Sequence, residues 1–591
     1  MHKNLRAFLE TLRKEKLLIE IDTEVDPYLE LAEIHRRVIE EEGPALLFKR
    51  VKDSPFPVVT NLFGTRDRVD LAIGPKPEET VRRAIAALDR LLPPKPSVLW
   101  QERDWLLSLT KVGLNSAKSG RAPVLEVKAN DFDLRKLPAL TTWPEDGGPF
   151  VTLPLVYTEH PDTHQHNLGM YRIQIHGPKQ TGIHWQIQKG GGFHYFEAEQ
   201  RGQDLPTTLF LGGPPALTLS AIAPLPEMLP ELLFTSFLMG EKLPRTSVSD
   251  HPHPLVSEAE FAFCGIVPAH IRKPEGPFGD HYGYYSWKHD FPVFNIHTVY
   301  HRKDAIYPAT VVGKPRQEDY FVGEYMQSLL SPLFPLVMPG VRSLWTYGET
   351  GFHALASAIV RESYHREALS TAFAILGQGQ LSLTKFLLLT DVPLDLKDFR
   401  TLLENVLARF EPESDLVIFH ETSMDTLDYT GRRLNHGSKA VMLGLGERKR
   451  NLPSEYTQGQ NQLPSGTHAA KVFCPGCLML TGPRFEERPE WAESIIQDLN
   501  FESFNEWPLI ILVDDLDLAT TAAGFLWQVF TRFDPAHDIY AQSELRHHRI
   551  IYHGPILIDA RMKPDYPGEV IPLDETVKLV NQRWKEYGIK F

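Results

Sequence analysis

Two stretches near the C-terminal end of the chain repeat one another. Residues 387–415, LLLTDVPLDLKDFRTLLENVLARFEPESD, and residues 510–538, IILVDDLDLATTAAGFLWQVFTRFDPAHD, align without a gap at an offset of 123 positions. Each is typical of an apolar strand, an acidic turn and an amphipathic helix that ends before a proline. Two such units can share composition by chance, but both end in the same Arg-Phe-acid-Pro-x-x-Asp string. We therefore predict a C-terminal α/β unit in two related copies.

The rest of the chain divides by its hydrophobic pattern. Residues 1–108 mix helical and strand periodicities, which predicts an N-terminal α/β domain. Residues 109–333 carry short apolar alternations separated by Gly and Pro, which predicts a β-rich domain, a barrel or a sandwich. The two C-terminal copies then occupy residues 334–450 and 451–591. The expected fold class is a multidomain α/β and α+β protein.

The charge balance argues against one large class of partner. The chain has 591 residues, with 62 Lys and Arg against 76 Asp and Glu, so its net charge is −14. A phosphate backbone needs a basic face, so we expect no nucleic-acid partner. The N-terminal stretch lacks the apolar core of a signal peptide, and no apolar run reaches the roughly 18 residues of a membrane helix. We expect no membrane span and a cytoplasmic location.

The cysteines are too few for a disulfide scaffold. Only three occur, Cys264, Cys474 and Cys477. The last two form a CPGC string with thioredoxin-like spacing, but a second pair that would complete a zinc site is missing from the sequence. We predict a thiol pair in a surface turn.

The string EGPFGD, residues 275–280, places two carboxylates five residues apart. Its glycines tolerate positive φ and its proline pre-sets φ, so a tight turn can hold Glu275 and Asp280 on one side of a loop. Two carboxylates in one pocket do not both ionise easily, so one is driven toward the protonated state that a proton donor needs. A solvated acidic turn is the simpler interpretation of the string taken by itself.

A second polar pattern lies in NLGMYRIQIHG, residues 167–177. A strand here would place Arg172, Gln174 and His176 on one face. Such a face can simply be solvated, or its arginine can bind a carboxylate or phosphate through a bidentate fork. Asn167 can cap a turn or offer its carbonyl oxygen to a hard cation.

A third pattern lies in PLPEMLPE, residues 224–231. Glu227 and Glu231 would share one face of a helix that begins after a proline. They would form either an exposed first turn, favoured by the helix dipole, or part of a metal site completed by ligands from elsewhere.

Together these segments resemble the UbiD-type decarboxylases, which use prenylated flavin mononucleotide (prenylated FMN). The landmarks are NLFGT at 61–65, NLGMYR at 167–172, EGPFGDHYGYY at 275–285 and AIYPATVVGKP at 305–315. The resemblance extends from the N-terminus to about residue 450, and the remaining residues correspond to the second repeat copy. The combination of strings is specific, although no one of them is.

The resemblance implies an architecture and a reaction. The architecture is an N-terminal α/β domain, a central split β-barrel that binds the flavin, and a C-terminal α/β domain used in oligomerisation. The reaction is the reversible, non-oxidative decarboxylation of an aromatic or α,β-unsaturated acid, with the flavin as electron sink. Acids of quinone biosynthesis, such as a prenylated hydroxybenzoate or a fused-ring acid, are the implied substrates.

The resemblance also implies roles for single residues. Asp280 matches the proton donor, and Glu275 and Arg172 match its partners. Arg172 would keep Glu275 ionised, while burial would keep Asp280 protonatable. The positions that match flavin contacts are Asn167, Met170, Tyr171, Arg172, His184, Trp185, Gln186, Gln188, Lys189, Gly190 and Glu231, with Lys439 as a lysine on the phosphate side.

Asn167 and Glu231 match ligands of a divalent cation, usually Mn²⁺, that joins the cofactor phosphate to the protein; K⁺ is a further implied cation. Oxygen ligands suit such a hard ion. The sequence departs from the family at position 188, where Gln stands in place of a metal-binding His. A Gln carbonyl binds Mn²⁺ more weakly than imidazole does. His184 or His194 could supply the imidazole instead.

The implied partners are the aromatic acid, a flavin prenyltransferase that supplies the cofactor, and identical subunits in a dimer or hexamer. Two alternatives stay open. Gln188 leaves room for a flavin-binding protein that has lost decarboxylation or uses unmodified flavin, and the repeat leaves room for a non-catalytic assembly scaffold. Co-expression with a flavin prenyltransferase separates them, since the purified chain would carry prenylated flavin, unmodified flavin or none.

Overall fold

The structure is a computed structural model that describes residues 2–590 except 75–76, 92–95, 118, 187–188, 226–228, 457–462, 499–503 and 505. The chain forms two compact units. Unit 1 comprises Met1–Leu329 together with Gly568–Phe591, and unit 2 comprises Leu330–Pro567. The domain boundaries expected within each unit remain predictions. The last residues, which the sequence pattern assigns to the second repeat copy, group with unit 1.

Unit 1 begins with helices around a small mixed sheet. In α1 (Leu5–Lys14) the stripe Leu5, Phe8, Leu9 and Leu12 is buried, and the Asn4 side chain caps the helix by accepting from the N–H of Ala7. The sheet has the order β1-β2-β3-β17. Its strands are β1 (Leu18–Ile21), β2 (Ala45–Phe48), β3 (Val58–Thr60) and β17 (Tyr307–Pro308). The flanking helices are α2 (Glu30–Glu40), α3 (Arg66–Ile73), α4 (Pro77–Leu91), α5 (Pro96–Gln101) and α6 (Arg103–Leu109).

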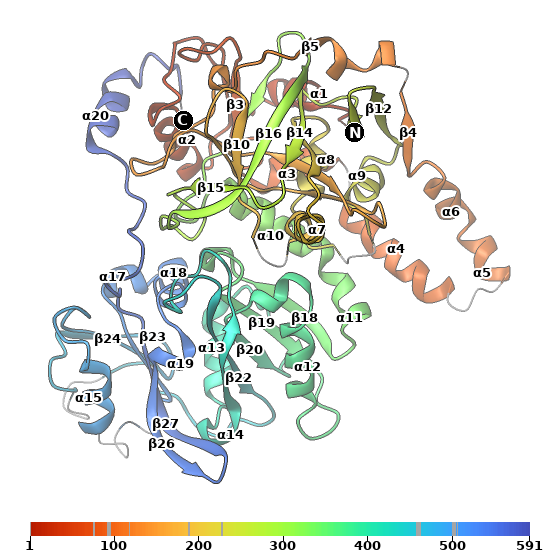
Figure 1. Cartoon of the computed structure of the whole chain (residues 1–591). Coiled ribbons are helices and arrows are strands. Elements are labelled where there is room, and N and C mark those ends of the chain that lie inside the picture. The colour runs from red at the N-terminus through yellow and green to blue at the C-terminus, as the bar shows by residue number, and fades with distance from the viewer. Residues whose placement is uncertain are drawn as a thin grey trace. The chain divides into compact units, whose positions relative to one another are not determined.

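A ten-stranded antiparallel sheet forms the centre of unit 1. Its order is β6-β9-β10-β16-β14-β11-β7-β8, and β5 and β15 both pair with β16. Figure 1 labels β5, β10, β14, β15 and β16 of this sheet. The described pairings form an open path and do not close into a ring, so the split β-barrel stays a prediction. The strands are β5 (Val127–Ala129), β6 (Phe150–Val151), β7 (Leu155–Glu159), β8 (His166–Gly169), β9 (Ile173–Ile175), β10 (Gln180–Ile183), β11 (Leu205–Leu211), β14 (Phe261–Val267), β15 (Arg272–Glu275) and β16 (His289–His301).

Aromatic and β-branched side chains make this sheet the core of unit 1. Phe261, Phe263 and Phe294 are fully buried and belong to one cluster that reaches from the small mixed sheet to the ten-stranded sheet. Three short strands form a separate sheet, namely β13 (His251–Val256), β12 (Leu243–Val248) and β4 (Leu114–Ser116). Further α-helices in the described part of unit 1 are α7 (Gly190–Gln200), α8 (Pro215–Ser220), α9 (Glu231–Met239) and α10 (Glu318–Leu330).

Unit 2 contains two five-stranded sheets of the same topology. Their orders are β18-β19-β20-β22-β21 and β23-β24-β25-β27-β26. In both, the successive pairings are antiparallel, parallel, parallel and antiparallel. Both repeat stretches also end in a four-residue helix that starts with proline, α14 (Pro412–Asp415) and α19 (Pro535–Asp538). The matching topology accommodates the predicted repeat, whose common origin remains an inference.

The first sheet of unit 2 consists of β18 (Val341–Thr346), β19 (Leu355–Val360), β20 (Phe386–Thr390), β21 (Leu416–Ser423) and β22 (His436–Gly444). The second consists of β23 (Ala469–Cys474), β24 (Cys477–Thr481), β25 (Leu509–Leu512), β26 (Ile539–Arg546) and β27 (Arg549–Asp559). Among the described residues, the α-helices of unit 2 are α11 (Phe334–Val337), α12 (Glu367–Leu376), α13 (Phe399–Leu407), α15 (Trp491–Asp498), α17 (Leu516–Ala519) and α18 (Ala522–Phe530), besides α14 and α19.

The chain ends on unit 1. Helix α20 (Asp574–Arg583) packs against α2, so the last residues of the chain lie beside a helix near its beginning (Figure 1). In the part of the chain that the structure describes, no helix has both the length and the apolar character to cross a membrane.

Candidate active site

The EGPFGD string forms the loop that follows β15. Glu275 is the last residue of the strand, and Gly276 then adopts φ +90°, which favours glycine. Gly279 lies against the ring of Trp143, where a Cβ would come within 2.1 Å of Cδ1. The N–H of Asp280 donates to the carbonyl of Tyr284 at 3.0 Å, so the chain turns back directly after the acid. The glycines therefore allow a tight turn that brings the two carboxylates together.

Arg172 joins the two carboxylates. Its Nε and Nη2 donate to the two oxygens of Glu275 at 2.8 and 2.9 Å, and its Nη1 donates to Oδ2 of Asp280. Nη2 also donates to the hydroxyl of Ser286 at 3.0 Å, and the guanidinium lies 4.9 Å from the centroid of the Phe278 ring. The structure thus brings together the three residues that the sequence proposed as a catalytic group. A guanidinium suits this place because its planar fork binds several oxygens at once.

The strand predicted over residues 167–177 is interrupted. It forms as β8 and β9, and Met170–Arg172 lie between them outside either strand. Arg172 therefore does not alternate with Gln174 along one strand face. Gln174 still contacts the same loop, because its Oε1 accepts from the N–H of Gly276 at 2.9 Å. The alternation of residues predicts one continuous strand and gives no sign of the break at Met170–Arg172. This break lets the Arg172 side chain reach Glu275 and Asp280.

Both carboxylates have lowered pKa values. Burial alone would raise the pKa of Glu275, but the charge of Arg172 and the contact with His184 outweigh it. Burial also opposes ionisation of Asp280, and hydrogen bonds from His281 with the charge of Arg172 outweigh it in the same way. The expectation that burial drives one acid toward its protonated form is thus corrected. A guanidinium that touches both acids removes the repulsion on which that expectation rested.

Two histidines, His184 and His281, also contact the acids. Neither contact was predicted from the sequence. His184 Nδ1 lies 3.1 Å from Oε2 of Glu275, and His281 Nδ1 lies 2.7 Å from Oδ1 of Asp280. His184 is buried, whereas the His281 side chain is 24% exposed, so of these two histidines His281 is the one that reaches solvent. The adjacency of Asp280 and His281 in the sequence was the available signal.

Asn167 and Glu231 also come close together. The carboxylate of Glu231, the first residue of α9, accepts from the N–H of Leu168 at 3.2 Å, directly beside Asn167. Burial raises the pKa of Glu231 to about 7. Among the described residues, no basic side chain pairs with this carboxylate. A half-buried acid that contacts the backbone next to Asn167 offers an oxygen ligand of the kind that a hard divalent cation takes, and such a cation would supply positive charge there.

The start of α7 completes this corner of the site. A Cβ on Gly190 would lie 2.2 Å from Oδ1 of Asn167, so glycine is required for the helix to approach the amide. Lys189 is the N-cap residue, and three successive glycines begin the helix. The N–H of Gly191 donates to the hydroxyl of Tyr171 at 3.2 Å, and that hydroxyl also accepts from Nδ2 of Asn167. Helix N-termini of this kind favour phosphate.

The other positions matched to flavin contacts surround this corner. Trp185 is buried, and its Nε1 has no hydrogen-bond partner among the described residues; the same holds for Nε2 of His184. Buried polar atoms without partners, such as the Nε1–H donor of Trp185 and Nε2 of His184, fit a bound polar cofactor. Met170 and Gln186 are half-buried. Gln188, as well as Glu227 of the third pattern, lies outside the described residues.

Two proposed imidazole donors and one lysine have partners of their own. His184 is bonded to Glu275 as described, and Nδ1 of His194 lies 2.9 Å from the Thr158 hydroxyl. Lys439 lies in unit 2, where its Nζ donates to the carbonyl of Thr384 at 2.9 Å, and burial lowers its pKa to about 8.

The CPGC cysteines are not at the surface. They face each other across the β23–β24 hairpin, and Cys474 and Cys477 are 5% and 0% exposed. The prediction of a surface turn is therefore wrong. Gly476 in the turn lies against Leu452, which covers the hairpin, and burial raises the pKa of Cys477 well above its usual value.

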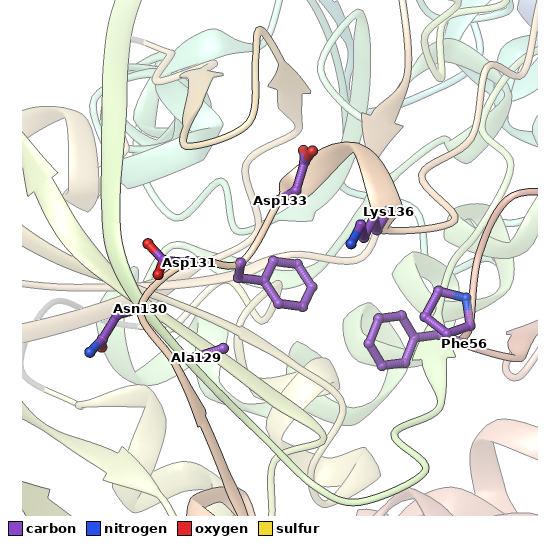
Figure 2. Close-up of a pocket in the computed structure, with 8 residues that line it drawn as sticks. Phe56, Ala129, Asn130, Asp131, Asp133 and Lys136 are labelled. Carbon is purple, nitrogen blue, oxygen red and sulfur yellow. The ribbon is translucent and has the colours of Figure 1, made fainter.

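A pocket of about 530 Å³ lies elsewhere in unit 1 (Figure 2). It is lined by Pro55, Phe56, Ala129, Asn130, Asp131, Phe132, Asp133 and Lys136. None of the proposed site residues lines it, and Asp133 is paired with Arg135. We therefore assign the site to the group around Arg172, where buried charges converge.

The chain is similar to known proteins over most of its length. Residues 9–88, 115–315 and 320–444 match the models of the N-terminal, Rift-related and C-terminal domains of 3-octaprenyl-4-hydroxybenzoate carboxy-lyase, UbiD. A Chlamydia pneumoniae protein named as a subunit of 4-hydroxybenzoate decarboxylase is 52% identical over 585 residues, covering 99% of this chain and 98% of the relative. The chain belongs to the UbiD family. Its assignment as a carboxy-lyase from the sequence is confirmed.

The chain is also similar to proteins of lower identity. A protein of Archaeoglobus fulgidus is 35% identical over 438 residues, covering 73% of this chain and 89% of the relative. The closed form of Sedimentibacter hydroxybenzoicus vanillic acid decarboxylase superposes with a TM-score of 0.67 at 22% identity, covering 79% of this chain and 97% of that structure. The FMN complex of the UbiD-class enzyme HmfF from Pelotomaculum thermopropionicum superposes with a TM-score of 0.62 at 24% identity. The match covers 76% of this chain and 97% of that structure. These structures establish the fold.

The matched UbiD models end at residue 444. The second sheet of unit 2 and the C-terminal residues that group with unit 1 lie beyond them. The Chlamydia pneumoniae relative nevertheless aligns over almost the whole chain. The additional C-terminal region is thus shared with that relative.

Proposed function

We propose that this UbiD-family decarboxylase removes CO₂, reversibly and without net oxidation, from an aromatic or α,β-unsaturated carboxylic acid, with prenylated FMN as cofactor. The observation that carries the proposal is the buried group in which Arg172 binds Glu275 and Asp280 together. The hydroxybenzoate class of acids is the proposed substrate. It is supported by the name of the Chlamydia pneumoniae relative, which is 52% identical to this chain.

The reaction needs one proton for each carboxylate that is lost as CO₂. Asp280 is the acid that can deliver it, because its side chain is 11% exposed whereas that of Glu275 is completely buried. Glu275 stays ionised against Arg172 and holds the guanidinium in place. Asp280 is ionised at rest, so it must take up a proton before it acts as the acid.

Bound prenylated FMN would supply the electron sink that makes loss of CO₂ possible. Asn167 and Glu231 would hold a divalent cation, with Mn²⁺ the proposed ion, at the cofactor phosphate. The start of α7 at Gly190 would face the same phosphate. In support, the UbiD-class enzyme HmfF has been solved with FMN and, in an evolved dimeric form, with prenylated FMN. The side-chain carbonyl oxygen of Gln188 is proposed as a further ligand of the same cation.

The wider assignments are proposed on the same basis. A flavin prenyltransferase would supply the cofactor, and the chain would act in the cytoplasm as an even-numbered homo-oligomer. A role in quinone biosynthesis is a finer proposal that depends on the identity of the acid. The two sheets of unit 2 are proposed to be related copies, supported by their identical order and pairing directions.

Reconstitution tests the function. The chain is co-expressed with a flavin prenyltransferase and incubated with a panel of aromatic acids, and released CO₂ is measured together with the mass of the bound flavin. We expect turnover of a hydroxybenzoate by protein that carries prenylated FMN. Asp280→Asn should retain the flavin and lose turnover by about 10²–10⁴-fold. Protein that holds only unmodified flavin and releases no CO₂ from any acid would refute the proposal.

A further inference from the structure

The C-terminal segment, residues 568–590, pairs with the loop that carries Asp280. The N–H of Tyr285 donates to the carbonyl of Gly568, and the N–H of Val570 donates to the carbonyl of Gly283, both at 3.0 Å. Between these bonds, Glu569 and Tyr284 form an antiparallel bridge. Three residues of the segment therefore extend the loop as a short strand would.

Side chains reinforce this pairing. Val570 is 4% exposed and belongs to a buried cluster with Ala32, Trp143, Tyr285 and Val311. Glu569 pairs with Lys314, whose Nζ lies 2.8 Å from Oε1. The segment is thus held by a buried apolar residue and by an ion pair on opposite sides of the bridge.

The same loop residues hold the acid. The N–H of Asp280 donates to the carbonyl of Tyr284, and the N–H of Gly283 donates to the carbonyl of Asp280. Trp143, which packs with Val570, also lies against Gly279, the residue before the acid. A shift of the C-terminal segment would therefore move the peptide groups that set the position of the Asp280 carboxylate.

The far end of the segment is anchored on α2. Glu30 accepts from the hydroxyl of Tyr587 at 2.6 Å and pairs with Arg583. Arg37 donates to Oδ1 of Asn581 at 2.7 Å. Because the segment is fixed at both ends, it resists displacement from the loop.

We propose that residues 568–590 are a positioning element of the active site, which holds the Asp280 loop in register with Arg172. This inference rests on the proposed function for the role of Asp280. It gives the region beyond residue 444, where the family models end, a direct part in the site. Val570 and Glu569 are positioning residues, since they act on Asp280 through the loop.

Val570→Pro tests the pairing, because proline lacks the N–H that donates to Gly283. We expect kcat to fall at least tenfold, because small misplacements of a reacting group are costly, with KM and flavin content unchanged. Val570→Thr keeps the N–H and the side-chain shape and should restore kcat. The matched control is Ile571→Pro, at a side chain that is 63% exposed and whose N–H none of the described hydrogen bonds uses.

Amide hydrogen exchange over residues 280–285 gives a second measurement that does not depend on activity. Exchange should quicken at least tenfold in Val570→Pro and stay unchanged in Ile571→Pro. Unchanged exchange in Val570→Pro would overturn the inference, and so would faster exchange with an unchanged kcat. If the wild-type holoenzyme releases no CO₂, the proposed function fails, and exchange at the loop alone then decides whether the segment positions it.

Discussion

Nδ1 of His281 lies 2.7 Å from Oδ1 of Asp280, and the backbone N–H of His281 donates to the same oxygen at 2.7 Å. Asp280 is ionised at rest, so the imidazole donates to it. Each turnover consumes one proton, and His281 is the neighbour of Asp280 that also reaches solvent. We therefore expect His281 to return protons to Asp280 between turnovers.

Replacing His281 by Asn keeps a hydrogen-bond donor beside Asp280 but removes a group that can take up and release a proton. We expect kcat to fall at least tenfold while flavin content stays unchanged. In His281→Ala, added imidazole should restore part of the rate. His547→Asn, at an exposed histidine of the β26–β27 hairpin, is the matched control. A kcat equal to wild type in His281→Asn would show that protons reach Asp280 by another route.

Arg172 contacts four oxygens through three nitrogens. Because it supplies both a charge and a planar fork, two substitutions at this position should have different effects. Arg172→Lys keeps the charge but cannot bridge both carboxylates, so we expect at least a hundredfold loss of decarboxylation in a folded protein. Arg172→Met leaves Glu275 buried without a counter-charge, which should cost roughly 3–5 kcal/mol of stability. Decarboxylation rates and urea unfolding of the two variants measure these losses. Similar stability in both variants would contradict the prediction that the charge of Arg172 stabilises buried Glu275.

Sequence reasoning anticipated the meeting of Arg172 with the two acids but not its electrostatics. Resemblance to a family can predict which distant residues share a site. It does not predict their pKa values, which depend on every charge in contact with each group. The expectation let Arg172 keep Glu275 ionised but left Asp280 to burial alone, whereas the same guanidinium also binds Asp280 and lowers its pKa. His281 was overlooked because successive side chains of a strand diverge, whereas the turn over residues 280–283 brings its imidazole onto the neighbouring carboxylate.

The contact between residues 568–570 and the loop could not be predicted from the sequence. Backbone N–H and carbonyl groups make it, and these are present at every non-proline residue. By contrast, the strand–turn–helix pattern of the repeat was visible, because hydrophobic periodicity records which faces are buried. The CPGC turn was misplaced at the surface because local turn chemistry carries no information about Leu452 packing over it.

Glu231 should control divalent-cation binding. Its half-buried carboxylate accepts from the N–H of Leu168, next to Asn167 in the chain, and Glu231→Gln removes the charge with little change in shape. We expect the affinity for Mn²⁺, measured by calorimetry on the apo protein, to fall at least tenfold, and flavin retention to fall with it. Glu241→Gln, at an exposed glutamate just beyond the other end of α9, should bind as wild type does. Equal Mn²⁺ affinity in both variants would remove Glu231 from the ligand set.

Two buried histidines should make unit 1 sensitive to acid. His251 and His253 both contact the hydroxyl of Thr208, at 2.8 and 3.1 Å. Burial lowers the pKa of His251 to about 4 and that of His253 to about 3. In the unfolded chain both would titrate near pH 6.5, so the unfolded state binds more protons at intermediate pH. Their contribution to stability is complete above about pH 6.5 and is lost as the pH falls toward 4.

His253→Asn removes one of these titrations while keeping a polar side chain near Thr208. Between pH 8 and pH 5, one such histidine costs the wild type roughly 2 kcal/mol, because the unfolded state gains a proton that the folded state excludes. The variant should therefore lose less stability than wild type over this interval, read as the shift in its urea midpoint. His164→Asn, at an exposed histidine of unit 1, should lose as much as wild type. An equal loss of stability in His253→Asn and wild type would contradict the prediction. It would mean that His253 is already protonated in the folded protein at pH 5, despite its buried contact with Thr208.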